Sequence, residues 1–206
     1  KLYAAALLAF TKGTRLKMSP EGFSKFLNMP ENALIEEMDY MSKTIPSSWE
    51  FVDITFSIQN VSRACAQQIT RTRTASYAMQ SQRVTDMSEV TFHVPDAIFN
   101  DELAYQFYCA SFDQSMANYR DIIKTGASLE DARGLLPINA HCNLIAKYNL
   151  RTLVDLLRAR DSLRVQGEYR EVAKQMRERV FQIWPWAKPF FEPKHKTRSE
   201  EHTSEL

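Results

Sequence analysis

The chain has few of the residues that build disulfide-linked or metal-bound folds. Its 206 residues include three cysteines, five glycines and four histidines. The cysteines are odd in number and widely spaced (Cys65, Cys109, Cys142), which argues against a disulfide framework or a zinc ribbon and favours a reducing cytoplasm. With so few histidines we expect no metal site. The glycines form no Gly-x-Gly-x-x-Gly motif, so a Rossmann-type dinucleotide site is excluded.

Long apolar runs and an excess of charge of one sign are also missing. No hydrophobic stretch approaches the roughly 20 residues of a membrane span, and no secretory signal pattern opens the chain. The 26 basic and 25 acidic side chains nearly cancel, which argues against a nonspecific nucleic-acid binder. We therefore expect a cytoplasmic protein with no membrane or nucleic-acid partner. We also expect a bacterial or viral (metagenomic) origin.

The hydrophobic pattern mixes helical and strand periods. Apolar residues at helical spacing predict helices over 31–42, 61–70, 96–124, 149–162 and 168–185. Alternation predicts a strand over 51–59, and weaker patterns predict strands over 90–94 and 141–148. Ser128 is expected to cap a short helix that Pro137 ends, and Asn149 to cap the helix after it. The last helix is predicted to bury one stripe, made of Val172, Met176, Val180 and Ile183.

Without regular alternation of strands and helices, these elements predict a single α+β domain, a mixed or antiparallel sheet packed with long helices. We expect this domain to cover residues 1–197. Residues 198–206 are polar and have no apolar period, so we expect them to be a non-native tail.

The segment from Gln68 to Arg83 has the first concentration of polar chemistry. It contains three arginines, several hydroxyls and several amides, with no acidic residue among them. Guanidinium groups match the geometry of phosphate, and hydroxyls and loop amides can bind its remaining oxygens. This composition predicts an anion-binding loop. The alternative is a solvated basic loop.

A second polar segment runs from Ala132 to Arg160. It contains Ala-Arg-Gly-Leu-Leu-Pro137, then Asn149-Leu-Arg151, Asp155 and Arg160. Arg151 and Asp155 are four residues apart on one predicted helical face, the spacing of a surface salt bridge. Taken alone, this segment is more typical of structure than of a binding site.

Together, the two segments resemble the flavin-dependent, or alternative, thymidylate synthases. That family has Arg-His-Arg, seven variable residues and Ser; this chain has Arg71-Thr-Arg73, seven residues and Ser81. Ala132-Arg-x-x-Leu-Pro137, Asn149-x-Arg151, Arg160 and Gln166-x-Glu168 follow at the family's spacing. The resemblance covers about residues 45–191.

The resemblance implies a nucleotide site and a flavin site. Deoxyuridine monophosphate (dUMP) would be bound by Gln68, Arg71, Gln80, Ser81, Gln82, Arg83, Arg133 and Arg160. Flavin adenine dinucleotide (FAD) would be bound by Ser47, Arg71, Thr72, Arg73, Met79, Asn149, Arg151 and Asp155. Arg160 matches the catalytic arginine, which stabilises the charge of the activated pyrimidine. Methylene-tetrahydrofolate would donate the carbon, NADPH would reduce the flavin, and the enzyme would be a homotetramer.

The chain departs from the family pattern on the flavin side. Thr72 replaces the motif histidine, Met79 stands where Gln or Glu is usual, and the family's upstream His-x-Ser-Pro-x-Glu-His reads Ile45-Pro-Ser-Ser-Trp-Glu-Phe51. Two alternatives therefore stay open. One is a pyrimidine-nucleotide hydroxymethylase on the same fold, in which water quenches the methylene intermediate. The other is a non-catalytic nucleotide-binding or RNA-binding module.

Overall fold

The computed structural model describes residues 2–15, 19, 21–160 and 167–192. These form two compact units, each described here by itself. The helical unit contains residues from 2–53, 149–158 and 175–192, and the sheet unit contains residues from 54–148, 159–160 and 167–174. Both units take segments from both halves of the chain, so no single point divides it into consecutive domains. The expected tail, 198–206, lies outside the described residues.

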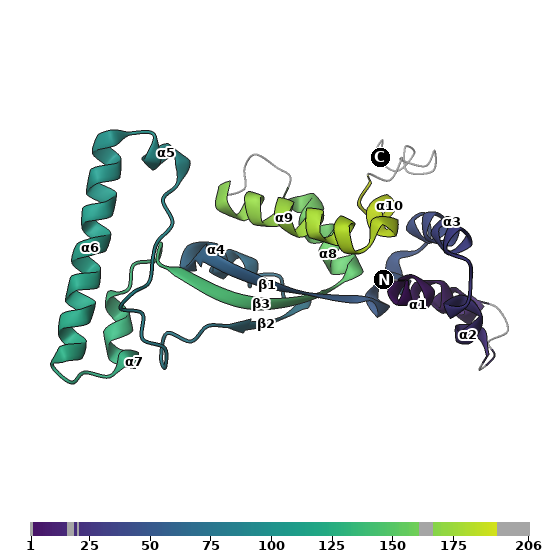
Figure 1. Ribbon diagram of the computed structural model, residues 1–206, viewed down its shortest axis with the longest axis horizontal. Helices are drawn as coiled ribbons and strands as arrows, with labels where there is room; N and C mark the ends of the chain where they lie inside the picture. The colour runs from purple at the N-terminus through teal and green to yellow at the C-terminus, as the bar shows by residue number, and fades with distance from the viewer. Residues whose placement is uncertain (1, 16–18, 20, 161–166, 193–206) are drawn as a thin grey trace, which may run out of the picture. The chain divides into compact units, whose positions relative to one another are not determined.

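The helical unit consists of short helices (Figure 1). Along the chain they are α1 (Tyr3–Thr11), η1 (Lys12–Arg15), α2 (Gly22–Leu27), α3 (Glu31–Ser42), η2 (Pro46–Phe51), α8 (Leu150–Ala159), η4 (Pro185–Ala187) and α10 (Lys188–Phe191). Helix α9 (Gly167–Ile183) belongs to both units. Trp49 fixes the core of this unit: its ring packs against Phe190 with centroids 5.0 Å apart, and its indole N–H donates to the Met41 carbonyl at 3.2 Å.

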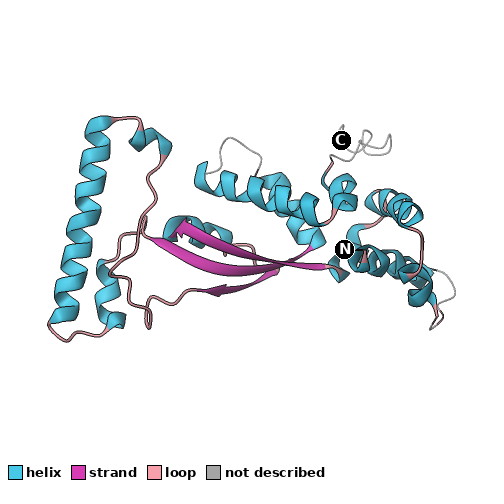
Figure 2. Ribbon diagram, in the orientation of Figure 1, coloured by secondary structure: helices cyan, strands magenta, loops and turns pink. Residues whose placement is uncertain are grey.

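The sheet unit is built on three strands, drawn in magenta in Figure 2. They are β1 (Asp53–Ser62), β2 (Ala75–Met79) and β3 (His141–Asn149), in the order β1-β3-β2. Strand β2 pairs antiparallel with β3, from Ala75 opposite Tyr148 to Met79 opposite Leu144. On the other side, the Leu150 amide donates to the Val52 carbonyl and the Arg63 amide donates to the Ala140 carbonyl, so β1 also runs antiparallel to β3.

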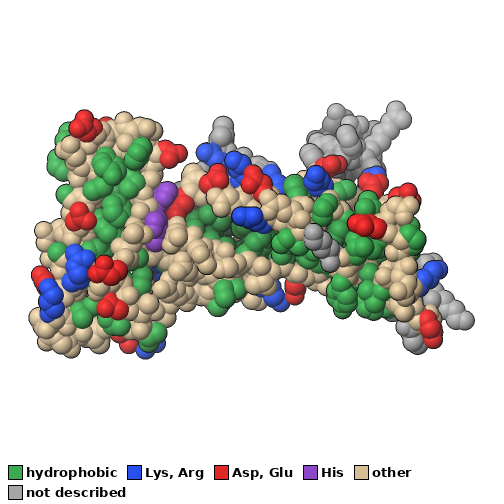
Figure 3. Space-filling view, in the orientation of Figure 1, with side chains coloured by type: hydrophobic (Ala, Val, Ile, Leu, Met, Phe, Trp, Pro, Cys, Tyr) green, Lys and Arg blue, Asp and Glu red, His purple; other side chains and the backbone are tan. Residues whose placement is uncertain are grey.

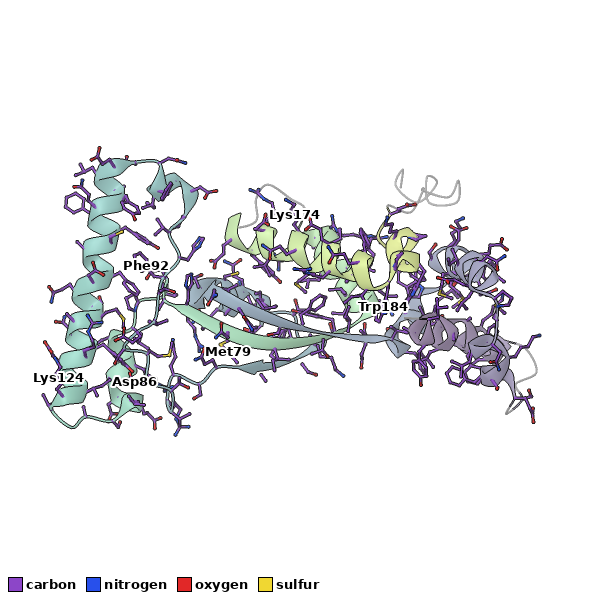
Figure 4. All side chains as sticks on the ribbon, in the orientation of Figure 1. Met79, Asp86, Phe92, Lys124, Lys174 and Trp184 are labelled. Atoms are coloured by element: carbon purple, nitrogen blue, oxygen red, sulfur yellow. The ribbon has the colours of Figure 1, made fainter. Side chains whose placement is uncertain are left out.

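The helices of the sheet unit form two groups. Helix α4 (Arg63–Ile69) and the beginning of α9 lie on one side of the sheet (Figure 1). The rest are α5 (Asp96–Phe99), α6 (Glu102–Lys124), α7 (Leu129–Ala132) and η3 (Arg133–Leu135). Phe92 points toward α6 (Figure 4) and stacks on Phe112 at 4.0 Å between centroids, beside the buried Met116 and Tyr119.

Most of the predicted elements are present, and the α+β class is confirmed. The helix over 31–42 has the predicted bounds, and the strands predicted over 51–59 and 141–148 are β1 and β3. Both predicted caps form: the Ser128 hydroxyl accepts from the Asp131 amide at 3.1 Å, and the Asn149 side chain accepts from the Thr152 amide at 2.8 Å.

Four expectations were wrong in detail. The predicted helix over 96–124 breaks before Glu102, because the Asp101 side chain caps α6 by accepting from the Ala104 amide. The strand predicted over 90–94 is reduced to one bridge, from Phe92 to Ala140. Strand β2 lies where a loop was expected. Helix α9 buries Tyr169, Ala173, Met176 and Val180, whereas Val172 is half-buried and Ile183 is 46% exposed.

Among the residues that the structure describes, no helix is both long and apolar enough to cross a bilayer.

Candidate functional site

Two of the predicted phosphate-binding arginines are joined by a carboxylate. Arg83 binds both oxygens of Glu130, with Nε 2.9 Å from Oε1 and Nη2 3.0 Å from Oε2. The Nη2 atom of Arg133 lies 3.9 Å from the same Oε1. All three side chains are 42–59% exposed. The segment from Gln68 to Arg83 contains no acidic residue, but the fold supplies Glu130 from α7. Figure 3 shows basic and acidic side chains side by side at the end of the sheet unit that carries α6 and α7.

The pairing of β2 with β3 explains why Arg83 lies there. The Gln80 amide donates to the Asn143 carbonyl at 2.9 Å and extends the ladder by one residue. The chain then turns: the Ser81 carbonyl accepts from the Thr85 amide, and the Ser81 hydroxyl accepts from the Arg83 amide at 3.2 Å. Gln80 through Arg83 thus form one turn at the end of a sheet strand, which presents their side chains together.

The turn after α4 carries the other predicted anion-binding residues. Gln68 lies in the last turn of α4, and its carbonyl accepts from the Arg71 amide at 3.2 Å. Tyr77 of β2 holds this turn, since its hydroxyl lies 2.9 Å from the Ile69 carbonyl and 3.0 Å from that of Thr72. Arg71 and Arg73 are exposed and make no ion pair with any described residue.

Arg160 lies against Tyr169 of α9. Its guanidinium carbon is 4.7 Å from the centroid of the Tyr169 ring, a cation–π arrangement. The Arg160 Nε atom is buried and has no hydrogen-bond partner among the described residues. The hydroxyl of Tyr169, which is also buried, interacts with the Arg160 guanidinium, and the buried hydroxyl of Tyr148 interacts with that of Tyr77. A buried N–H without an acceptor is costly, so a ligand oxygen would find an unmatched donor at Arg160.

Two buried thiols of the sheet unit, Cys65 and Cys142, are poorly suited to nucleophilic chemistry. Burial, together with the Glu168 carboxylate and Cys142, raises the pKa of Cys65 to about 12. Burial also raises the pKa of Cys142, although the Arg63 guanidinium opposes the shift. Because the thiolate is the reactive form, the raised pKa values disfavour both cysteines as nucleophiles.

The remaining flavin candidates belong to the helical unit. Ser47 lines a pocket of about 230 Å³ together with Lys12, Tyr40 and Phe51. Arg151 pairs with Glu50, Nη1 to Oε1 at 2.6 Å, and not with Asp155 as its spacing predicted. Asp155 is exposed on α8. Met79, by contrast, lies in the sheet unit (Figure 4), where its sulfur accepts from the Arg63 guanidinium.

The sequence placed Glu168 only in a motif at the family's spacing, and it gave no site role to Glu130 or Tyr169. Glu168 is 8% exposed in its side chain, accepts from the Ser62 amide and hydroxyl at 2.6 and 2.5 Å, and lies 3.9 Å from the His93 ring nitrogen. For Glu130, the sequence signal was its place in the acidic first turn of a helix, which is common to many helices and does not indicate a site. Arg83, the partner of Glu130, and Ser62, the partner of Glu168, lie far away in the chain, so only the fold identifies these pairs.

Comparison with known proteins gives a consistent result. The family model for thymidylate synthase complementing proteins matches residues 13–186. A flavin-dependent thymidylate synthase of Pyrococcus abyssi (strain GE5 / Orsay) is 36% identical over 149 residues, which cover 68% of this chain and 61% of that protein. The corresponding enzyme of Pyrococcus horikoshii is 33% identical over 194 residues, covering 89% and 77%. That of Clostridium tetani is 29% identical over 184 residues, covering 82% and 70%.

The matched lengths differ from one relative to another. The chain spans 61% of the length of the Pyrococcus abyssi and Pyrococcus furiosus relatives.

Proposed function

This chain belongs to the family of thymidylate synthase complementing proteins, and we propose that it is a flavin-dependent thymidylate synthase. It would convert dUMP to dTMP, with methylene-tetrahydrofolate as carbon donor and NADPH as the source of reducing equivalents. The named activity of its relatives supports this proposal. The arginine chemistry of the sheet unit supports it independently.

The surroundings of Arg160 are the observation that supports the proposal most directly. For C5 of uracil to attack a carbon electrophile, electron density must rise in the ring, and negative charge develops at its oxygens. A fixed guanidinium beside the ring stabilises that charge and does not have to reorganise during the reaction. Arg160 fits this role because its ring contact with Tyr169 fixes the guanidinium while its buried Nε keeps an unused donor.

The phosphate end of dUMP would be bound by the exposed arginines. We propose that Arg83 and Arg133 bind the phosphate, because forked guanidinium groups match its oxygens. The other proposed nucleotide contacts are Gln68, Arg71, Gln80, Ser81 and Gln82. In this arrangement no protein nucleophile is needed, which agrees with the raised thiol pKa values of Cys65 and Cys142.

The chain also has donors that suit a flavin dinucleotide. Arg71 and Arg73 are exposed and form no ion pair within the described part of the chain, so their guanidinium groups are available to a diphosphate. We propose that these two arginines, with Thr72 and Met79, contact FAD in the sheet unit. In the helical unit, the resemblance to the family implies Ser47, Asn149, Arg151 and Asp155 as further FAD contacts. When bound, the flavin supplies the hydride that reduces the transferred carbon. We further propose a homotetramer.

Product analysis of the purified protein tests this function. The full chain, incubated with dUMP, methylene-tetrahydrofolate, FAD and NADPH, is expected to form dTMP and to show the absorbance of a bound flavin. Formation of hydroxymethyl-dUMP would assign the hydroxymethylase reaction instead. A protein that forms neither product and binds no dUMP in calorimetry would contradict the proposal.

The Glu130→Gln variant is expected to bind dUMP more tightly than the native protein. Glu130 occupies the guanidinium fork of Arg83 that a phosphate would need. Because this ion pair is exposed, its loss releases only about 0.2–1 kcal/mol, which is up to about fivefold in affinity. Titration calorimetry with dUMP measures the change, and the gain should shrink at high salt.

Glu36→Gln is the matched control, since it removes one exposed carboxylate from α3. Weaker dUMP binding by Glu130→Gln would show that Glu130 orients Arg83 and does not compete with the phosphate.

A further inference from the structure

Helix α9 begins with two neighbouring side chains that contact different parts of the proposed nucleotide site. Tyr169 is fully buried, and its ring lies 4.7 Å from the Arg160 guanidinium carbon. Arg160 precedes α9 and has no other aromatic partner among the described residues. The face of Tyr169 therefore sets the plane in which the guanidinium can lie.

The other neighbour, Glu168, holds the start of α4. Its carboxylate accepts from both the amide and the hydroxyl of Ser62. Ser62 is 1% exposed and is the N-cap of α4, because its hydroxyl oxygen accepts from the Cys65 amide at 3.0 Å. The Ser62 hydroxyl thus donates to Glu168 and accepts from α4 at the same time, which fixes its orientation.

Helix α4 carries this constraint to the anion-binding turn. It is seven residues long, begins after Ser62 and ends at Ile69, two residues before Arg71. Tyr77 holds the far end through the Ile69 carbonyl. The Arg63 and Ala64 amides also anchor this helix, since they donate to the Ala140 and Ile138 carbonyls. Because so short a helix moves as one body, a shift at its N-cap also moves Gln68 and the turn that follows.

We propose that Glu168 and Tyr169 are positioning residues that hold Arg160 and the α4–Arg71 turn in register, so that one nucleotide is bound at its pyrimidine and its phosphate together. The inference rests on the proposed function for its ligand. Adjacent residues on one helical turn move as a unit, so the two contacts keep a fixed separation. Tyr169 acts on the orientation of Arg160, and Glu168 acts on the affinity for the phosphate end.

Two variants of Tyr169 separate the contribution of its ring from that of its hydroxyl. Tyr169→Phe keeps the ring and its contact with the Arg160 guanidinium, so it is expected to exchange the C5 hydrogen of dUMP with solvent within about threefold of the native rate. Tyr169→Leu removes the ring and should lower the exchange rate on the order of tenfold or more, with a smaller loss of dUMP affinity.

A spectroscopic signal follows Arg160 without reference to activity. The NMR resonance of the Arg160 Nε–H group, assigned by its loss in Arg160→Lys, should be shifted by the ring in the native protein and in Tyr169→Phe, and should move in Tyr169→Leu. Equal resonances and equal exchange rates in the Phe and Leu variants would overturn the role of Tyr169. A shifted resonance in a native protein that binds no dUMP would instead overturn the proposed function.

The role of Glu168 is tested by variants that remove one or both of the carboxylate oxygens that accept from Ser62. Glu168→Ala should weaken dUMP binding by about tenfold in calorimetry, which reports only the folded fraction. Glu168→Gln keeps one acceptor oxygen for Ser62 and should restore most of the affinity. Adding Ser62→Ala to Glu168→Ala should cause little further loss, because both changes break the same contact.

Glu178→Gln, an exposed position on α9, is the matched control and should bind dUMP normally. Native affinity in Glu168→Ala, or additive losses in the double variant, would overturn the role of Glu168.

Discussion

Replacing Arg160 with lysine is expected to lower the turnover of dUMP by about 10²–10³-fold, the usual loss when one donor to a developing oxyanion is removed. Lysine keeps the positive charge but loses the planar fork and the Nε–H group that is buried without a partner. If Arg160 stabilises the activated pyrimidine, its contribution is larger in the transition state than in the ground state. Turnover should therefore fall much more than nucleotide affinity.

Two measurements separate the possible roles of Arg160. Exchange of the C5 hydrogen, followed by NMR, reports activation of the pyrimidine alone, whereas dTMP formation reports the complete reaction. Arg179→Lys, an exposed position on α9, is the control and should leave both unchanged. Native turnover in Arg160→Lys would mean that Arg160 only positions the nucleotide. Normal exchange without dTMP would assign it to the reduction step.

Alanine at Arg83 or at Arg133 is expected to weaken dUMP binding by about 1.5–3 kcal/mol, the range for hydrogen bonds to a charged group. This corresponds to roughly 10–150-fold in affinity. Because Glu130 contacts both arginines, removal of one leaves the other paired with the competing carboxylate. The two losses should therefore not add in the double variant. Arg71→Ala, on the separate α4 turn, should add independently.

Titration calorimetry at fixed ionic strength measures these losses, with Arg179→Ala as a control for the change in charge. Unchanged affinity in the Arg71, Arg83 and Arg133 variants would remove the phosphate from this part of the sheet unit.

Local signals in the sequence predicted the elements whose stability is local. Ser128 and Asn149 cap the next helices because a short polar side chain can reach an amide three residues ahead. Strand β3 was predicted because its side chains alternate between buried and exposed. Such features depend on neighbouring residues, so a single sequence contains them.

Strand β2 was missed because its own pattern is weak. Its residues alternate between half-buried and exposed, and none is fully buried. It is a strand because β3 offers it a ladder of backbone hydrogen bonds. The same dependence on distant residues explains the stripe of α9. Tyr169 has a polar hydroxyl and was not included in the predicted apolar stripe, yet in the fold it is fully buried and its ring contacts Arg160.

The residues of the candidate site fall into the same two groups, those that the sequence identifies and those that depend on distant parts of the fold. Motif spacing could name Arg71, Arg83, Arg133 and Arg160, since the resemblance supplies their positions. It could not show that Glu130 pairs with Arg83, because the choice of partner depends on how α7 meets the turn after β2. It also could not show that Glu168 reaches Ser62 across the fold.

The central place of β3 determines when the sheet can form during synthesis. Strands β1 and β2 both pair with β3, and β3 is the last of the three to leave the ribosome. At about 5–20 residues per second, the interval between the end of β1 and the start of β3 is several seconds. During that time β1 exposes Ile54, Ile58 and Val61, together with its unpaired backbone groups. The three-stranded pairing of the sheet unit can therefore be completed only after residue 149 has emerged.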